Sequence, residues 1–522
     1  MTLGSTILKF SPDFSQPFDA DLQNSGWPIR PSQSRAVFDA FDSALIAYLD
    51  IRQTEKIDKV LLAASAQVSG LARTLLELAL LHQHAAERGV SFSASNSAYQ
   101  FIAGETTTFS PTLISPPPLP SVRGSYSRRL ARMFSWSGPL RLIPAAIERE
   151  EVVVSHNTLL IAELRRNRRA PHYRYAQEYF INLEAKPEVS VDIGDLAEDL
   201  TTVILRSVAH LIEPSTRLRT ALTETFKPTL TDTARKTQHA SHLRTLPKKI
   251  LGGSGGSMLG RILGLEVLSR GGDVTRFDHG GTPVTVPQGI PYYLIEMLPT
   301  ARFITFSNPA VKNLESNVLG LSGTKFSMPK IQPGAGDPTF DIRLPSIPPP
   351  QDRRKIRVLY LNTAFRGIWQ YPTPLLSDQV YLEFQLHVLS SLRREFETVA
   401  LRPHPEGMLR GYEHPLAERL KVETRPLSTA LQDYDVIVFD YRRTSSLWQT
   451  VCTDRGVVFI DLDLDPINDP CRKGFHDRVE SINAHYDEAN QPYINQAQLG
   501  LAVERCLEKR DPSFFRELLL AG

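Results

Sequence analysis

The sequence predicts an α/β protein with two doubly wound parallel-sheet domains, and three observations support this prediction. The chain has 522 residues, more than one hydrophobic core usually holds, so two or three domains are expected. Short, continuous apolar segments alternate with helical segments, which is typical of strands that are buried on both faces of a parallel sheet. A proline-rich segment at residues 344–350 (LPSIPPP) separates two such regions, and polyproline is stiff and cannot join a sheet.

These patterns divide the chain into four parts. We expect a helical lead-in at residues 1–55, an α/β domain with a helical insertion at 56–308, a Pro-rich linker at 309–352, and a second α/β domain at 353–522.

The first half contains two segments in which strands and helices alternate. Residues 59–64 (KVLLAA) have the composition of a short buried strand, followed by a helix at 69–88 and a strand at 89–93. Together they would make one βαβ unit. Residues 125–240 are expected to be mostly helical. The second segment comprises strands at 249–253, 273–277 and 302–306, with helices at 258–269 and near 291–298.

The alternation is most regular after the proline-rich segment. Strands are expected at 356–361, 398–401, 421–424, 435–439 and 457–461, and helices at 377–394, near 415–420, at 428–432, at 445–455 and at the end of the chain.

Composition excludes several classes of protein. The net charge of +2 gives no global field for a polyanion, so no nucleic-acid partner is expected. Cys452, Cys471 and Cys506 lie far apart, which argues against a disulfide framework or a structural zinc site and fits a reducing cytoplasm. We expect neither a signal peptide nor a membrane-spanning segment. The basic stretches at 123–132 and 165–169 either contact anionic lipid at the inner membrane face or are simply solvated.

Polar residues follow several of the predicted strands, where an open parallel sheet binds its ligands. Thr444, Ser445 and Ser446 open a helix, where hydroxyls and free N–H groups suit a phosphate. Plain N-capping of the helix explains them as well.

Two further strand ends carry cationic or flexible residues. In the motif Arg402-Pro-His404-Pro the prolines fix the backbone around the imidazole, and the arginine offers a forked donor to phosphate. A loop histidine bonded to a neighbour is the alternative. Arg366 and Gly367 follow the strand at 356–361 and are candidates for the same ligand.

The motif Asp278-His279-Gly280-Gly281 follows a strand of the first domain. An Asp or His at this place, followed by glycines that let a ligand approach the backbone, suits a general base. The alternative is a turn in which the glycines only supply positive φ. Either residue, Asp278 or His279, remains a candidate for the base.

Two other motifs have weaker chemical meaning. The run GGSGGS at residues 252–257, which includes Ser254, lies between a strand and a helix but lacks the Lys-Ser/Thr ending of a phosphate-binding Walker loop. We expect it to be a turn on the acceptor side. Asp461, Asp463 and Asp465 alternate along the chain but lack the glycine and terminal Glu of a calcium loop, so no metal and no cofactor are expected.

The order and spacing of these motifs resemble a group of bacterial enzymes. Arg402-Pro-His404-Pro, with Thr444-Ser445-Ser446 about forty residues later, resembles the His-Pro and Ser-Ser motifs of capsule and surface-polysaccharide glycosyltransferases of GT-B type. The group includes polysialyltransferases, Kdo transferases and CDP-glycerol glycerophosphotransferases. The segment ending in Asp278-His279-Gly-Gly looks like the stretch of these families that carries the presumed base. The resemblance covers roughly residues 248–307 and 355–465.

The resemblance implies a GT-B-like fold, in which two Rossmann-type domains face each other across a cleft and the C-terminal one binds the nucleotide donor. It further implies transfer of a sugar from a CMP- or CDP-linked donor to a surface polysaccharide, with a glycan or lipid-linked glycan as acceptor. A nucleotide-sugar epimerase or hydrolase on the same fold is the enzymatic alternative. A non-catalytic protein of polysaccharide assembly is the other.

Overall fold

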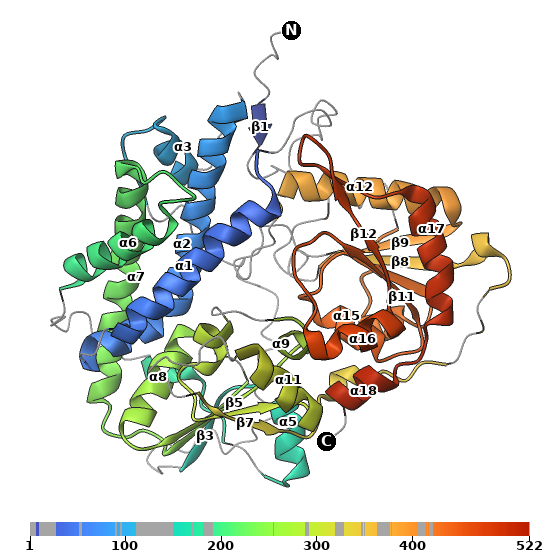
Figure 1. Cartoon of the computed structure of the whole chain (residues 1–522). Coiled ribbons are helices and arrows are strands. Elements are labelled where there is room, and N and C mark those ends of the chain that lie inside the picture. Colours follow the sequence, from blue (N-terminus) through green and yellow to red (C-terminus); the bar gives the residue numbers. More distant parts are fainter. Residues whose placement is uncertain are drawn as a thin grey trace.

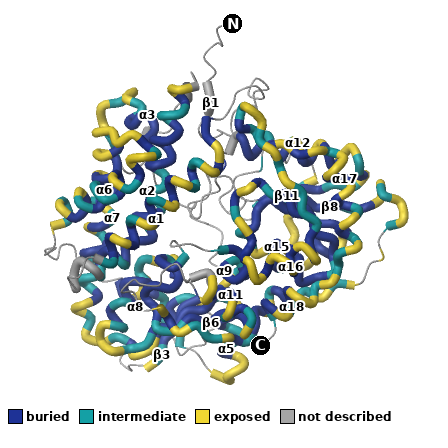
Figure 2. Tube along the Cα trace, in the orientation of Figure 1, coloured by how far each residue is buried: buried dark blue, intermediate teal, exposed yellow. Residues whose placement is uncertain are grey.

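The computed structural model describes most of the chain. The described residues are 7–9, 28–51, 55–88, 91–93, 97–110, 150–169, 172–180, 192–253, 255–287, 292–318, 328–345, 348, 350–362, 376, 378–404, 414, 416 and 421–520. Figure 1 shows a helical bundle, a first sheet domain below it and a second sheet domain beside both. The strands of both sheets are largely buried (Figure 2).

Five helices form the bundle: α1 (Pro31–Ile51), α2 (Glu55–Arg88), α3 (Ser97–Ala103), α6 (Ile193–Val208) and α7 (Thr216–His242). Helix α2 packs against α1, α3 and α7, and α6 packs against α1 and α7. Side chains cap two of the helices, since Asp192 accepts the backbone N–H of Asp195 at the start of α6 and Ser215 accepts that of Leu218 at the start of α7.

The strand predicted at residues 59–64 is wrong, because these residues lie inside α2. Six apolar residues in a row fit a buried helix as well as a buried strand, and periodicity alone does not separate the two. The strand predicted at 89–93 is present as β2 (Ser91–Ser93), but it pairs in parallel with β1 (Ile7–Lys9) and belongs to neither main sheet.

The first sheet contains β3 (Glu151–Ser155), β4 (Lys249–Gly252), β5 (Asp273–Phe277), β6 (Arg302–Thr305) and β7 (Lys330–Pro333), all parallel and in this order. Along its strands, apolar side chains alternate between two hydrophobic clusters. Val152, Ile250 and Val274 belong to the cluster that includes α8 (Met258–Ser269). Val153 and Leu251 belong to the one that includes α5 (Thr158–Arg166), so both faces are covered.

Shorter elements complete this domain: the 3-10 helix η4 (Ala176–Phe180), α9 (Thr282–Thr285), the π-helical turn η5 (Tyr293–Met297), α11 (Asn308–Val318) and the 3-10 helix η7 (Pro338–Phe340).

The structure differs from the expected linker at residues 309–352. Most of α11 and all of β7 lie within this range, so the first sheet continues to Pro333. Among the described strands β7 pairs with β6 alone, and a proline is tolerated at the end of such an edge strand.

The second sheet is also parallel and has the order β12-β11-β10-β8-β9. Its strands are β8 (Arg357–Leu361), β9 (Thr398–Arg402), β10 (Val436–Phe439), β11 (Gly456–Asp461) and β12 (Glu480–Asn483). Its helices are η8 (Arg353–Lys355), α12 (Asp378–Glu395), α14 (Leu427–Ala430), α15 (Ser445–Val451), α16 (Asp469–Arg478), α17 (Gln496–Arg505), η9 (Cys506–Glu508) and α18 (Ser513–Leu519). Strands β13 (His485–Tyr486) and β14 (Pro492–Tyr493) form a small separate antiparallel pair. Residues 421–424 contribute only a bridge between Val422 and Leu401. The helix predicted near 415–420 lies outside the described residues.

The prediction of two Rossmann-type parallel-sheet domains is therefore confirmed. Each sheet has five parallel strands, and helices cover the second sheet on both faces. On one face, Val358 and Val438 belong to the cluster that includes α12 and α17. On the other, Leu359 and Phe439 belong to the cluster that includes α15 and α16.

The two sheet domains share a hydrophobic cluster and several polar contacts. Helix α18 at the end of the chain packs against α11 of the first domain. Asn468 donates its backbone N–H to the carbonyl of Thr285 at 2.9 Å, and Ser307 donates its hydroxyl to the carbonyl of Leu518 at 2.6 Å. These contacts fix the first domain against α15, α16 and α18 of the second.

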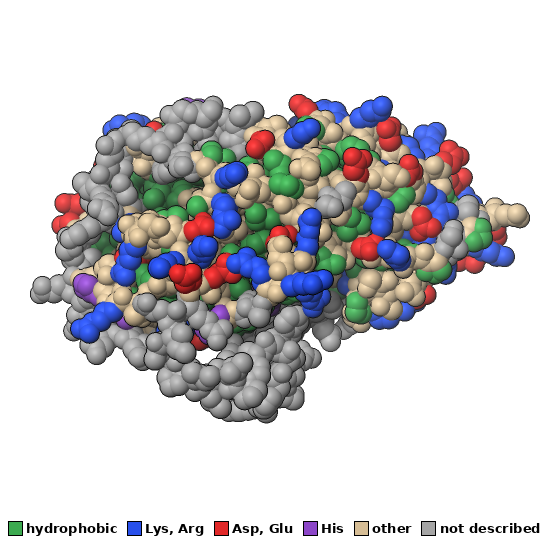
Figure 3. All heavy atoms as spheres, turned by 90° about the horizontal axis from the view of Figure 1, so that it is seen from below, with side chains coloured by type: hydrophobic (Ala, Val, Ile, Leu, Met, Phe, Trp, Pro, Cys, Tyr) green, Lys and Arg blue, Asp and Glu red, His purple; other side chains and the backbone are tan. Residues whose placement is uncertain are grey.

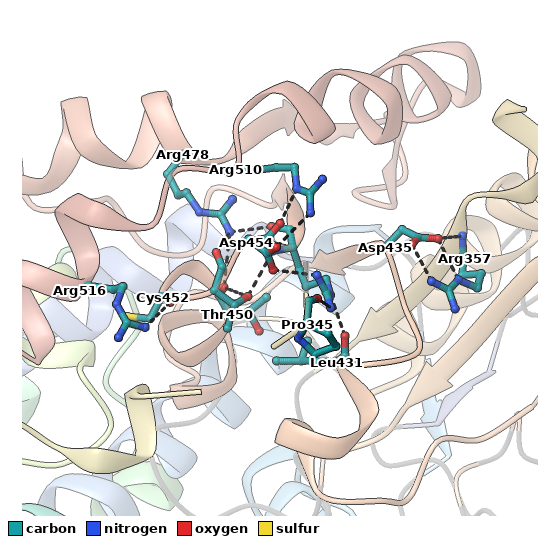
Figure 4. A network of polar contacts seen from close by, with 12 residues as sticks. Pro345, Arg357, Leu431, Asp435, Thr450, Cys452, Asp454, Arg478, Arg510 and Arg516 are labelled. Carbon is teal, nitrogen blue, oxygen red and sulfur yellow. Dashed lines mark hydrogen bonds and ion pairs between the residues drawn. The ribbon is translucent and has the colours of Figure 1, made fainter. Parts of the chain in front are cut away.

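A network of polar contacts around the buried Arg478 holds the C-terminal end of α15 in place (Figure 4). The guanidinium of Arg478 donates to the carbonyls of Val451 (3.1 Å), Thr453 (2.7 Å) and Arg455 (2.6 Å), just beyond the C-terminal end of α15. A cation at this end of a helix is favourable, and the carbonyls would otherwise be buried without partners. Arg357 and Asp435 form a bidentate pair at the opposite ends of β8 and β10 from the ligand side.

The surface carries both signs of charge. In Figure 3, Lys and Arg side chains are interspersed with Asp and Glu on the face shown. Among the described residues, no helix is both long and apolar enough to cross a bilayer.

Candidate functional site

The topology of the second sheet indicates where a ligand binds. In chain order β8 comes first, β9 then pairs on one side of it, and β10 returns to pair on its other side. The helices that follow β8 and β10, α12 and α15, belong to clusters on opposite faces of the sheet, and in open parallel sheets the crevice at such a point is the usual ligand site. In the first sheet β3 to β7 pair in chain order, but residues 172–174, which lie between β3 and β4 in the chain, bond to the other edge of β3, so this sheet has a similar point at the end of β3.

The loop after β10 leads into the first turn of α15. Thr444 is the N-cap, and its hydroxyl oxygen accepts the backbone N–H of Ser446 at 3.3 Å. Ser445 is exposed and Ser446 half-buried. The capping role considered for this motif thus holds for Thr444, whereas Ser445 is exposed beyond the carboxyl end of β10.

Buried residues behind this turn hold it rigidly. Trp448 is fully buried and donates its indole N–H to the carbonyl of Arg442 at 3.0 Å. Arg442 pairs with Asp461, and Arg443 pairs with Asp465. Two of the alternating aspartates are therefore neutralised by arginines.

The base candidates lie directly against this turn. Gly280 and Gly281 have φ of +78° and +75°, a left-handed conformation that favours glycine, and they bring the chain back from the end of β5. A Cβ atom placed on Gly280 would lie 3.6 Å from Cβ of Ser445, and one on Gly281 would lie 3.3 Å from Cβ of Trp448. The structure thus brings the Asp278-His279-Gly-Gly loop of the first domain into contact with the Ser-Ser turn of the second.

The two base candidates differ sharply in accessibility. His279 is exposed, whereas Asp278 has none of its surface exposed. The carboxylate of Asp278 accepts the backbone N–H of His279 (2.7 Å) and the hydroxyls of Tyr292 (3.1 Å) and Thr305 (3.0 Å). Burial raises the pKa of Asp278 to about 7, although its hydrogen bonds and His279 oppose this shift. Only His279 is placed to reach a substrate.

The sequence interpretation missed Asn157, which organises this edge of the first sheet. Its side-chain amide donates to the carbonyls of Gly253 (2.6 Å), Phe277 (2.9 Å) and Asp278 (2.9 Å), at the ends of β4 and β5. Its oxygen accepts the N–H of Leu160 and caps α5. The signal was present: Asn157 follows the apolar run Val-Val-Val of β3, but that region was expected to be helical.

The glycine-rich run at residues 252–257 is occupied by contacts within the protein. The backbone N–H of Gly255 donates to Glu296 at 2.6 Å, and that of Gly253 donates to the hydroxyl oxygen of Ser155 at 3.1 Å. Buried Arg261 donates to the carbonyl of Gly255 at 2.8 Å. These contacts favour a packed turn over a phosphate cradle. Ser254 lies outside the described residues.

The remaining candidates follow β8 and β9. Arg402 donates to the carbonyls of Glu423 and Arg425, beyond the edge of the sheet, so the structure turns it away from the Ser-Ser turn. His404 is half-buried at the end of β9, which β8 separates from β10. Arg366 and Gly367 lie outside the described residues.

This arrangement offers an exposed imidazole on one domain and, in contact with its loop, an exposed serine at the first turn of a helix on the other. An imidazole can take a proton from a hydroxyl, and hydroxyl and N–H groups can stabilise a phosphate.

No family model and no curated protein matches this chain. Solved structures do show similarity in fold. A co-structure of S. aureus MnaA with UDP is 10% identical, with a TM-score of 0.34, and the match covers 71% of this chain and 90% of that one. A putative UDP-N-acetylglucosamine 2-epimerase from Listeria monocytogenes is 11% identical, with a TM-score of 0.34 and coverage of 72% and 91%. The glycosyltransferase SnogD from Streptomyces nogalater is 14% identical, with a TM-score of 0.28 and coverage of 71% and 98%.

Proposed function

We propose that the protein is a metal-independent glycosyltransferase that moves a sugar from a nucleotide donor, CMP- or CDP-linked, to a surface glycan or lipid-linked glycan. One observation carries the proposal: the exposed His279 stands on a loop of the first domain that touches the Ser445 turn, at the crevice of the second domain. A base and a phosphate site on opposite domains are what a transfer between two substrates requires.

In this proposal His279 removes the proton from the acceptor hydroxyl while the nucleotide phosphate departs. Asp278 acts through the loop, since its carboxylate holds the backbone N–H of His279. Ser445 and Ser446 donate hydroxyl hydrogen bonds to the leaving phosphate. His404 assists from the end of β9, which β8 separates from β10, whereas Arg402, bonded to the carbonyls of Glu423 and Arg425, has no direct role. The cytidine base follows from the resemblance of the motifs.

Two measurements test the proposal. A thermal-shift screen of CMP, CDP, UDP and GDP reports which nucleotide binds, because a ligand that binds only the native state raises the melting temperature. His279→Ala should then lower transfer to the acceptor by about 10²-fold or more, with the affinity for the nucleotide unchanged. His210→Ala, an exposed histidine after α6, is the matched control.

The outcomes separate the alternatives. If no nucleotide binds, the donor site is wrong. If His279→Ala retains full transfer, the proposed base is wrong. If the enzyme alters a nucleotide sugar with no acceptor present, the epimerase or hydrolase reading replaces the transferase.

A further inference from the structure

Three polar side chains meet at the carboxyl end of β8. Asn362 is the first residue after this strand, Gln385 comes from α12, and His414 comes from the loop that follows β9. The amide nitrogen of Asn362 lies 2.8 Å from Oε1 of Gln385, and Nε2 of His414 lies 3.0 Å from the same oxygen. The proposed roles at the Ser-Ser turn and His279 use none of these residues.

The hydrogen bonds assign the tautomer of His414. Its Nδ1 accepts the backbone N–H of Leu416 at 3.2 Å, so Nδ1 carries no proton. Burial lowers the pKa of His414 to about 4, so the ring is neutral at pH 7 and its proton lies on Nε2. Nε2 therefore donates to Oε1 of Gln385 at 3.0 Å or, with both amides exchanged, to the amide oxygen of Asn362 at the position now 3.1 Å away.

Two amide atoms of this cluster are buried without a partner. Asn362 is 7% exposed and Gln385 is fully buried, yet Oδ1 of Asn362 and Nε2 of Gln385 make no hydrogen bond within the part of the chain that the structure describes. Exchanging O and N in both amides keeps the bond between them and again leaves one donor and one acceptor unpaired. The cluster thus presents a donor beside an acceptor in either orientation.

A native protein seldom buries unpaired polar atoms, because each loses its bonds to water. Asn362 directly follows β8, the strand that pairs with β10 at the reversal point of the sheet. The cluster is also held firmly: one turn before Gln385, Tyr381 donates its hydroxyl to both oxygens of buried Asp440, at 2.7 and 2.9 Å, at the end of β10. A fixed donor and acceptor side by side, at the end of the sheet where ligands bind, can hydrogen-bond to the edge of a flat polar molecule.

We propose that Asn362 and Gln385 bind the base of the nucleotide donor, pairing their free acceptor and donor with a donor and acceptor on the edge of the nucleobase. This inference rests on the proposed function and adds to it the part of the donor that is recognised. Nucleobases carry adjacent donors and acceptors on their edges, whereas a ribose phosphate has no such edge.

The experiment compares two probes on the intact chain by calorimetric titration. One is the nucleotide among CMP, CDP, UDP and GDP with the largest thermal shift, and the other is ribose 5-phosphate, which lacks the base. Both are titrated into the wild type, Gln385→Met and Asn362→Leu. His387→Gln is the control, since His387 lies on the same helix but contacts the carbonyl of Ile494.

We expect the wild type to bind the nucleotide at least about tenfold more tightly than ribose 5-phosphate, and each variant to lose about tenfold for the nucleotide only. The control should bind both probes like the wild type. Equal nucleotide affinity in wild type and variants would mean that a water fills the site, and would overturn the inference while leaving the donor site intact. Equal affinity of the wild type for the two probes overturns it without any variant, even if a variant does not fold. If no nucleotide binds, the proposed function falls as well.

Discussion

Replacing Gly281 by alanine should weaken the native state more than the same change at other glycines of similar backbone conformation. Gly281, Gly280 and Gly271 all have φ between +75° and +78°, so alanine is strained at each by about 1 kcal/mol. They differ in the space available to a new Cβ. At Gly271 nothing lies within 4 Å, and at Gly280 the nearest atom is Cβ of Ser445 at 3.6 Å, an ordinary contact.

At Gly281 a Cβ would meet three side chains from separate segments. The closest atoms belong to Phe340 at 3.1 Å, Trp448 at 3.3 Å and Leu519 at 3.4 Å. Phe340, Trp448 and Leu519 are all fully buried, so none can move aside freely, and crowding in a packed core adds about 1–3 kcal/mol. Gly281→Ala should therefore lower the free energy of unfolding by about 2–4 kcal/mol.

Urea unfolding followed by tryptophan fluorescence measures these differences. Gly271→Ala gives the effect of the backbone alone, and Gly280→Ala should match it within about 0.5 kcal/mol. If Gly281→Ala is no more destabilising than Gly271→Ala, then the two domains do not meet tightly at this loop. The proposed proximity of His279 to the Ser-Ser turn would then lose its basis.

Three further predictions concern buried polar groups. Burial raises the pKa of Asp278 from 3.8 to about 7. Because the protonated carboxyl is favoured in the folded state, Asp278 stabilises the fold fully below pH 3.8, and this stabilisation is lost as the pH rises through 7. Asp278→Asn should therefore flatten the fall in unfolding free energy between about pH 4 and pH 7, measured by urea titration at several pH values. Arg478→Met leaves several buried carbonyls unpaired and should lower the free energy of unfolding by about 3 kcal/mol or more. The control Arg472→Ala removes an exposed ion pair of the same helix and should change the free energy of unfolding by less than about 0.5 kcal/mol. Similar values for both variants would contradict the role of the network. Asn157→Asp keeps the cap of α5 but loses the donors to three carbonyls, so it should destabilise the fold and lower the rate of sugar transfer. A variant as stable and active as the wild type would show that only the cap matters.

The sequence predicted best those elements whose local pattern has a single meaning. Apolar strands bounded by polar tips, such as β5 and β10, appear within one residue of their expected ends. Two errors arose where a short pattern has two meanings. The apolar run at residues 59–64 belongs to a long helix, and the run Val152–Val154, which was assigned to a helical region, is the core of β3. Tertiary packing, which no short window contains, decides both cases.

The candidate site was predictable in its parts but not in its assembly. Strand-end motifs identified His279 and Ser445, because an unusual polar residue after an apolar strand is visible in the sequence. The contact between their loops, at Gly280 and Ser445, joins residues more than 150 positions apart, and nothing local encodes it. The orientation of the Arg402 side chain could not be predicted from the local sequence either, because the carbonyls that hold it belong to residues 423 and 425.

The proposed roles of the two domains fit the way their strand ends are occupied. In the second sheet the direction reverses between β8 and β10, and open parallel sheets usually bind their ligand at such a point. The first sheet has a similar point at the end of β3, but there the side chain of Asn157 bonds to the carbonyls at the ends of β4 and β5, and Asp278 is fully buried. The residue next to Asp278, His279, is exposed, and its backbone N–H is held by the carboxylate of Asp278. Because protein groups already occupy the strand ends of the first domain, we propose the base on the first domain and the donor site on the second.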